Sequence, residues 1–415
     1  MAGASGSEPD PPDAGPIVPP GPLVVIGGST VDPRGIPRRV LSVLDPETGV
    51  ELAREDLGLA GIVYDANTDL WYLFLSGTYP APRETPIDMQ VRRWQGDTWV
   101  HVASVPAIPP PAAEQFAVLN QRLAYASWRI GPGNVPVQAI TIFDTTDPTL
   151  LVEIPVPAEV VTVDDLSNPI IDLIGTPGRP NDARAPGGDL TLLLAKSCRM
   201  GATSTTCEMA AQPVTVGTSI SRGVVRSFGL YTGRPAVTHA VSRDLLLVAR
   251  PQASPLSVVL NQFNARTLVE VSTLVTSTST TQEVSGVAYG DCLDAALFVE
   301  GAPGAGNDMS LFAVSLVNAL GTRDSLGRPG EGAYFEPLTR TLIAPYRGEP
   351  VVNGGADAGA DAGAPAPAEI VAYRVAASGP SVAIERRRAP NWQPPVGLSV
   401  DTLAVRRPRN FNCPE

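Results

Sequence analysis

The chain has 415 residues, 43% of them hydrophobic, so it can bury a large core and does not have the composition of a disordered protein. Its net charge of −12 disfavours a nucleic-acid-binding function. Proline (43) and glycine (39) make up about a fifth of the residues, a density that helices do not tolerate and that short strands joined by turns require. These features predict an all-β fold.

The first 21 residues form a Pro/Gly/Ala/Ser/Asp-rich tract, which we expect to be a flexible tether. The chain has no apolar run long enough to cross a bilayer and no signal-peptide core after Met1. The tract resembles the segment that follows the lipidated cysteine of bacterial surface lipoproteins, which implies membrane contact only through a lipid anchor absent from this chain. A plain cytosolic start is the alternative.

The use of basic residues indicates the kind of genome. Lys196 is the one lysine among 30 basic residues, and alanine, glycine and proline are abundant, as in a high-GC genome. Together with the tether, this predicts an extracellular, outer-surface or periplasmic protein of a high-GC Gram-negative bacterium.

The sequence near the start of the chain predicts a β-hairpin. The apolar run 40–44 is followed by the turn sequence Asp-Pro-Glu-Thr-Gly (45–49) and by a second alternating run, 50–54. Variants of this pattern recur along the whole sequence.

The recurring unit is a set of four antiparallel strands, repeated at intervals of roughly 47 to 67 residues, as in propeller blades. Six units can be assigned in this way: 61–102, 116–154, 169–230, 236–274, 286–314 with a weak outer strand, and 333–385. A seventh unit would combine an inner strand at Val396–Val400 with the N-terminal strand Leu23–Ile26 and the opening hairpin. We therefore predict that residues 22–415 form one seven-bladed β-propeller of four-stranded blades, closed by pairing of its N- and C-terminal strands.

The motif V-x-V-x-D-x-x-T-G at 40–49 and the segment Ala139–Pro148 resemble the YVTN/NHL-like group of β-propellers. The resemblance covers nearly the whole chain after residue 22 at the level of fold. It implies a propeller but no particular activity, because such families include enzymes, sensors and scaffolds.

The four cysteines allow two disulfides, as suits an exported protein. Cys198 and Cys207 are expected to lie close together in one loop, so their bond would stabilise the fold only locally. By elimination Cys292 would pair with Cys413 and tie the C-terminus to a distant part of the chain. The alternative is that some of the four are buried free thiols.

The connections between the second and third strands of the units are the long ones, and they should gather on one face. We expect them at 77–88, 129–137, 197–213, 300–308 and 347–368. Four side chains expected there belong to types that are common at binding hot spots: Tyr79, Arg83, Trp128 and Arg129. The sequence predicts a binding scaffold for a protein or glycan partner, although Trp128 could equally pack beneath its own loop.

The alternative function is a hydrolase or lactonase that uses carboxylates in a central channel. The candidates are Asp65, Asp164, Asp165 and Asp401, although Asp65 and Asp401 follow inner strands at turns, where aspartate commonly caps the backbone. His239 could also reach the channel, but no nucleophile motif G-x-S-x-G accompanies it.

We expect neither a metal nor a cofactor. The chain has two histidines, too few for a histidine-based metal cluster. The segment 354–363 contains two aspartates among alanines and glycines, too few oxygen ligands for calcium. Its composition matches the N-terminal tether, so residues 353–368 are predicted to be a disordered loop insertion.

Overall fold

The structure is a computed structural model, and its described residues are 23–31, 34, 37–45, 50–66, 68–77, 81–147, 151–156, 170–177, 187–200, 205–233, 235–240, 243–253, 256–277, 284–290, 294–300, 309–317, 321–327, 334–336, 341–346, 369–378, 381–388 and 399–406. Within them the chain is almost entirely β-strand, as predicted from the proline and glycine content, and the one helical element is the short 3-10 helix η1 (Pro132–Asn134). No described helix is long and apolar enough to cross a membrane.

The described strands group into seven antiparallel sheets. The sheet that joins the chain ends contains β29 (Ser399–Arg406), β1 (Leu23–Val31), β2 (Pro37–Leu44) and β3 (Glu51–Glu55). The second sheet contains β4 (Leu59–Asp65), β5 (Leu70–Leu75), β6 (Ile87–Gln95) and β7 (Thr98–Ile108). The third contains β8 (Pro111–Leu119), β9 (Arg122–Ile130), β10 (Pro136–Asp144) and β11 (Leu151–Pro155). The fourth contains β12 (Ile170–Pro177), β13 (Gly188–Met200), β14 (Thr205–Val216), β15 (Ile220–Arg222) and β16 (Arg226–Thr232). The fifth contains β17 (Ala236–Ala240), β18 (Leu245–Ala253), β19 (Leu256–Asn264) and β20 (Glu270–Ser277). The sixth contains β21 (Val284–Gly290), β22 (Ala295–Glu300), β23 (Met309–Ser315) and β24 (Gly321–Gly327). The seventh contains β25 (Tyr334–Glu336), β26 (Thr341–Tyr346), β27 (Glu369–Ser378) and β28 (Ser381–Arg388).

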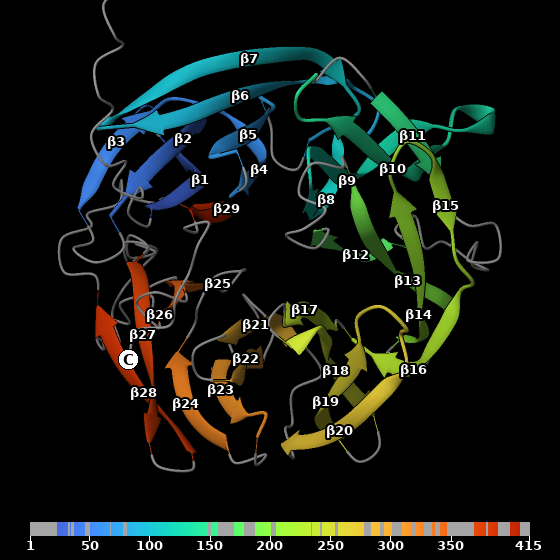
Figure 1. The fold of residues 1–415 in the computed structure, drawn as a ribbon. Helices are drawn as coiled ribbons and strands as arrows, with labels where there is room; N and C mark the ends of the chain where they lie inside the picture. Colours follow the sequence, from blue (N-terminus) through green and yellow to red (C-terminus); the bar gives the residue numbers. More distant parts are fainter. Residues whose placement is uncertain are drawn as a thin grey trace, which may run out of the picture.

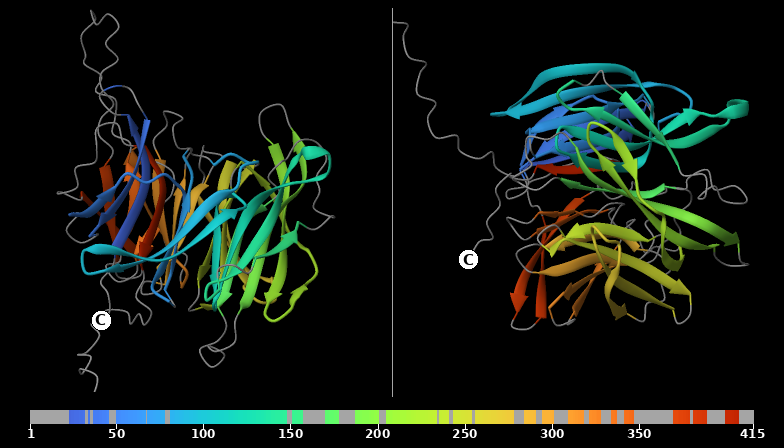
Figure 2. Two further views of the ribbon diagram at one scale, coloured as in Figure 1. Left: turned by 90° about the horizontal axis from the view of Figure 1, so that it is seen from above. Right: turned by 45° about the vertical axis from the view of Figure 1, so that its right-hand side comes forward.

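The sheets follow one another around a central axis, with strands such as β4, β12, β17 and β21 nearest the centre (Figures 1 and 2). The hydrophobic core is divided among the interfaces between consecutive sheets. One cluster, for example, joins Tyr72 and Phe74 of β5 to Tyr125 of β9 and Phe143 of β10, all at most 1% exposed. A single sheet could not bury both of its faces, so each depends on its two neighbours.

The degree of burial explains why some strands were easier to predict from the sequence than others. Every residue of β5 from Leu70 to Phe74 is buried, because this strand lies inside its sheet with a neighbouring sheet on either face. The outer strand β7 is mostly exposed and alternates weakly. The inner strands therefore carry the continuous apolar runs of the repeat, and the outer strands carry the weak ones.

The first and last described strands of the chain lie side by side. β1 pairs with β29 in antiparallel register, with Val25 opposite Ala404 and Ser29 opposite Ser399. The sheet thus takes one strand from the end of the chain and three from its start, the split that the sequence favoured. β29 spans Ser399–Arg406 and so contains the last two residues of the expected strand Val396–Val400, while residues 396–398 lie outside the described residues.

The third unit differs from the prediction of four strands. β15 and β16 pair with opposite halves of the same long strand, β14, so the outer position of this sheet is broken in two. The break faces Pro213, which has no N–H to donate to a partner, and Gly223 fits there because an added Cβ would lie 2.5 Å from Cγ of Pro213. Gly223 instead donates its N–H to the carbonyl of Pro213 at 2.8 Å.

Two of the expected long loops are instead extended hairpins. Residues 197–200 and 205–213 of one predicted loop belong to β13 and β14, and the predicted loop 129–137 shrinks to residues 131–135 because the β9–β10 ladder continues to Ile130. The expected tether at 1–21 and the insertion at 353–368 lie outside the described residues.

Candidate functional site

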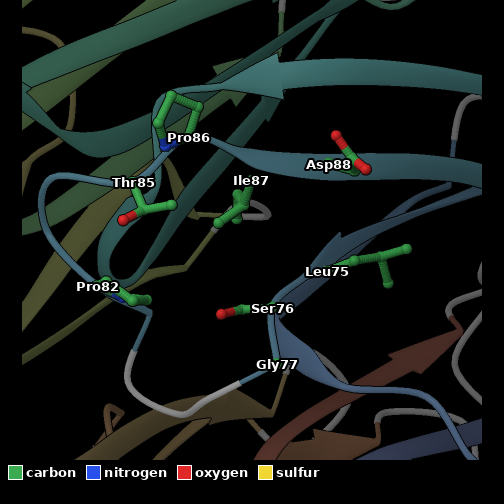
Figure 3. A pocket seen from close by; sticks show the side chains of 8 residues that line it. All are labelled: Leu75, Ser76, Gly77, Pro82, Thr85, Pro86, Ile87 and Asp88. Carbon is green, nitrogen blue, oxygen red and sulfur yellow. The ribbon is translucent and has the colours of Figure 1, made fainter.

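A pocket lies where the chain leaves β5 and returns to β6, inside one of the predicted long loops (Figure 3). Its volume is about 360 Å³, and Figure 3 shows Ser76 and Ile87 extending into the space that the loop encloses. The lining combines apolar residues with two hydroxyl-bearing ones and with Asp88, whose carboxylate points away from Ser76 and Ile87 in Figure 3: Leu75, Ser76, Gly77, Pro82, Thr85, Pro86, Ile87 and Asp88. Such a mixture suits a small ligand that carries several hydroxyl groups.

The base of this loop is fixed by the strands beneath it. The N–H of Ser76 donates to the carbonyl of Gly58 at 3.1 Å, and a Cβ at position 58 would lie 2.2 Å from the carbonyl oxygen of Ser76, so the close approach requires glycine. On the other side, Asp88 accepts a hydrogen bond from the N–H of Ala107 at 3.2 Å. The pocket is therefore held at one end by a backbone hydrogen bond and at the other by a hydrogen bond from the backbone to the Asp88 carboxylate.

Arg83 connects this loop to the next sheet. Its guanidinium carbon lies 4.4 Å from the ring centroid of Trp128 in β9, a cation–π contact between two residues that the sequence predicted for binding. Trp128 is only 3% exposed, so it does not offer an open aromatic surface, and the guanidinium over its ring comes from the loop of the neighbouring sheet. Arg83 itself is exposed.

Arg129 follows Trp128 on β9 and pairs with Val137 of β10. Its side chain is half-buried, and its Nε is fully buried without a hydrogen-bond partner. Arg129 makes no hydrogen bond or ion pair that involves described residues. Tyr79, the fourth predicted binding residue, lies outside the described residues.

The tip of the β9–β10 hairpin is apolar and exposed. Ile130 and Val135 flank η1 and are 48% and 58% exposed, and the N–H of Gly131 donates to the carbonyl of Val135 at 2.9 Å. Gly133 and Asn134 adopt positive φ in the turn. The tip thus holds two aliphatic side chains in solvent beside Trp128 and Arg129.

Two of the carboxylates expected in a central channel, Asp65 and Asp401, lie on described strands. Asp65 ends β4, is completely buried, and accepts a hydrogen bond of 2.7 Å from the hydroxyl of Thr68, so it stabilises a turn as the sequence suggested. Asp401 lies within β29 and not at a turn, which corrects the prediction. Asp164 and Asp165 lie outside the described residues, and no group of three or more metal-binding side chains occurs in the described part.

The opposite rim carries a repeated turn that the sequence analysis missed. Tyr64 donates a hydrogen bond to Asp69 at 3.0 Å, and Tyr289 donates to Asp294 at 2.9 Å, each across a turn that joins the first two strands of its sheet. Burial raises the pKa of Tyr64, as does the Asp69 carboxylate, so the phenol stays protonated and donates. The signal was the shared spacing Tyr-x4-Asp.

The bond between Cys198 and Cys207 is present and joins β13 to β14. The predicted pairing is confirmed, but its surroundings are corrected, because the two cysteines lie on adjacent strands and not in a loop. Cys292 and Cys413 lie outside the described residues.

No protein-family model matches the chain, and no curated protein matches it. Among solved structures, the chain is similar to a "putative 6-phosphogluconolactonase" from Bacteroides fragilis, with a TM-score of 0.52 and 10% identity over 92% of this chain and 97% of that one. A protein of the same description from Bacteroides uniformis gives the same TM-score and identity over 92% and 99% of the two chains. At such low identity the likeness shows the fold alone, and it confirms the predicted resemblance to β-propellers.

Proposed function

We propose that the chain is a closed, seven-bladed β-propeller that binds a protein or glycan partner through the face formed by the β5–β6 loop and the β9–β10 hairpin. The seven sheets and the β1–β29 pairing support the blade number and the closure. The name "binding face" is used below for the described residues of this loop and hairpin, 76–77, 81–88 and 128–137.

The observation that carries the proposal is the contact of Arg83 with Trp128. It brings the loop of one sheet onto the hairpin of the next, whose exposed residue Ile130 follows Trp128 by two positions. A buried aromatic residue, an exposed arginine and aliphatic side chains in solvent form the combination that is enriched at interaction sites.

Export from the cytoplasm is part of the same proposal. The disulfide between Cys198 and Cys207 suits an oxidising compartment, and the proline- and glycine-rich start of the sequence suits a tether behind a lipid anchor. A lipobox encoded immediately upstream of Met1 would support the anchor, whereas a stop codon there would refute it.

A propeller hydrolase or lactonase is the second candidate, and the names of the two similar Bacteroides structures favour it. The buried, hydrogen-bonded state of Asp65 disfavours it, because that carboxylate is already used by its turn. Hydrolysis of a panel of sugar lactones by the purified chain, if it were abolished by substitution of Asp401, would establish this candidate in place of the scaffold.

The test is to measure binding of the purified chain to arrays of glycans and of extracellular proteins, and then to substitute the binding face. We expect Val135→Ser and Arg83→Ala to weaken binding of any hit at least tenfold. Val271→Ser on the outer strand β20 is the matched control, because Val135 and Val271 are both 58% exposed. Binding that responds equally to both valine variants would contradict the proposed face.

A further inference from the structure

One tyrosine and three of the five tryptophans of the chain form a continuous row of rings across the β4–β7 sheet. The ring centroid of Tyr64 in β4 lies 4.8 Å from that of Trp71 in β5. Trp71 lies 5.8 Å from Trp99 of β7, and Trp99 lies 5.0 Å from Trp94 of β6. Because β4 is the innermost strand and β7 the outermost (Figure 1), this aromatic row runs from the inner edge of the sheet to its outer edge.

The ring separations in the aromatic row are van der Waals contacts. Electrons transfer readily between rings in contact, because orbital overlap falls steeply with distance. Indole and phenol are also the side chains of this sheet that lose one electron most easily. The row therefore offers three short steps between Tyr64 and the outer strand in place of one long one.

The middle of the aromatic row is removed from water. Trp71 is fully buried and Trp94 is 4% exposed, and both pack with Leu41 and Val43 of the closing sheet, whereas Trp99 is half-buried. The indole N–H groups of Trp71 and Trp99 are buried and donate to no described residue. An oxidised indole with no proton acceptor stays a radical cation, which readily takes an electron from the next ring. Such rings pass an oxidising equivalent on and do not retain it.

The inner end of the aromatic row has a proton acceptor. The phenol of Tyr64 donates a hydrogen bond to the Asp69 carboxylate at 3.0 Å. Oxidation makes a phenol proton strongly acidic, so a carboxylate within hydrogen-bond distance accepts it as the electron leaves. The product is a neutral phenoxyl radical, which is more stable than the radical cation of Trp71. An oxidising equivalent in the row therefore moves toward Tyr64.

We infer that the β4–β7 sheet conducts one-electron oxidising equivalents from its outer strand to Tyr64. The co-reactant is a one-electron oxidant of high potential, such as an oxidised metal complex, that meets β7. It gains one electron from Trp99, which gains one from Trp71, which in turn gains one from Tyr64. The phenol proton passes to Asp69, so a tyrosyl radical and a protonated carboxyl remain in the protein. This activity is separate from the binding face and does not rest on the proposed function.

The test places an oxidant at the outer end of the aromatic row. His101 is exposed on β7, two positions from Trp99, and its imidazole can carry a ruthenium bipyridyl photosensitiser. Protein labelled only at His101 is identified by peptide mapping and is flash-oxidised with hexaammineruthenium as the diffusible electron acceptor. Transient absorption then follows the radicals. We expect a tryptophan radical that is replaced by a tyrosyl radical.

Four variants assign the path. Trp71→Phe keeps a ring but removes an oxidisable one, so it should abolish the tyrosyl radical, and Tyr64→Phe should leave the tryptophan radical as the last species. Asp69→Asn should suppress tyrosyl formation, because an amide does not take up the proton, and asparagine tolerates the φ of +54° at this position. Tyr72→Phe is the control: Tyr72 is fully buried, follows Trp71 on β5 and contacts Phe143 of the next sheet, so this variant should keep the full signal.

Three results would overturn the inference: no tyrosyl radical in the parent chain, a tyrosyl radical that survives Trp71→Phe, or equal losses in Trp71→Phe and Tyr72→Phe. If Trp71→Phe fails to fold, Trp99→Phe tests the same row at its half-buried end. That variant should slow the appearance of the tyrosyl radical, and an unchanged rate would also refute the path.

Discussion

Tyr289 donates a hydrogen bond of 2.9 Å to Asp294, which also forms an ion pair with Arg243 of the preceding sheet. Through these two contacts the Asp294 carboxylate both stabilises its own turn and links two sheets. Asp294 also has a φ of +49°, a left-handed conformation that most side chains disfavour. We predict that Asp294→Ala lowers the free energy of unfolding by about 2 kcal/mol, because two partners lose their acceptor. Urea unfolding followed by circular dichroism measures the change.

Asp294→Asn is the informative companion variant. Asparagine tolerates the left-handed conformation and can still accept the phenol hydrogen bond, so it should recover about half of the loss. If the alanine and asparagine variants were equally destabilised, the ion pair with Arg243 would be the whole effect, and the turn hydrogen bond would contribute nothing.

Gly61 of β4 packs directly against a ring of the next sheet. A Cβ built at this position would lie 2.5 Å from Cζ of Phe116, whose ring is held against Phe74 at a centroid distance of 4.9 Å. We predict that Gly61→Ala costs about 1–3 kcal/mol through overpacking, and that Phe116→Leu in the same chain recovers part of it. Gly77→Ala, where an added Cβ meets nothing within 4 Å, serves as the control in the same thermal-unfolding series.

The sequence predicted the strands well where burial was complete and turns were local. The opening hairpin is an example, since the N–H of Asp45 donates to the carbonyl of Val50 at 3.0 Å across the predicted turn. The prediction from the sequence failed where the length of a strand depended on the strand with which it pairs. Arg129 was assigned to the loop 129–137, yet the ladder with β10 keeps it in a strand.

The contacts of the candidate site were less predictable than its residues. Arg83, Trp128 and Arg129 were chosen by residue type, but nothing in the sequence indicated that Arg83 would cover Trp128 from another sheet, 45 positions away along the chain. Contacts of that kind depend on how consecutive sheets pack against each other, which local patterns do not encode. The Tyr-x4-Asp turns are local by contrast, and their shared spacing was visible in the sequence.

Asp144 makes the stability of the β8–β11 sheet depend on pH. Burial alone would raise the pKa of this carboxyl, but the hydroxyl and N–H of Thr146, at 2.6 and 2.7 Å, and the ion pair with Arg122 outweigh it, so the pKa is lowered. A lowered pKa in the folded state stabilises the fold above the unfolded value of about 4, and this contribution is lost as the pH falls through the folded value.

We therefore predict that Asp144→Asn is destabilising at pH 7 and that the difference from the parent chain shrinks as the pH falls below about 4. Urea unfolding at pH 7, 5 and 3 measures it, with the exposed Asp97→Asn in the β6–β7 turn as the control. A difference that is constant across this range would show that the carboxylate charge contributes nothing.

The two cysteine pairs should contribute unequally to stability. Cys198 and Cys207 are nine positions apart on adjacent strands, so their bond closes a short loop worth roughly 2–3 kcal/mol by loop-closure entropy. A bond between Cys292 and Cys413 would close a loop of about 120 residues and contribute nearer 5 kcal/mol. We expect the double serine variant of the second pair to lower the melting temperature more than that of the first, and equal losses would contradict the second pairing.

The proposed closure of the ring can be tested where the chain ends meet. Ser29 of β1 lies opposite Ser399 of β29, so Ser29→Cys with Ser399→Cys should form a disulfide on mild oxidation, identified by mass spectrometry of the linked peptides. Because this bond would close nearly the whole chain into one loop, oxidation should raise the melting temperature by several degrees. Ser29→Cys with Ser378→Cys on β27 is the control, since these positions are not paired, and cross-linking that is equal in both variants would mean that the ends move apart in solution.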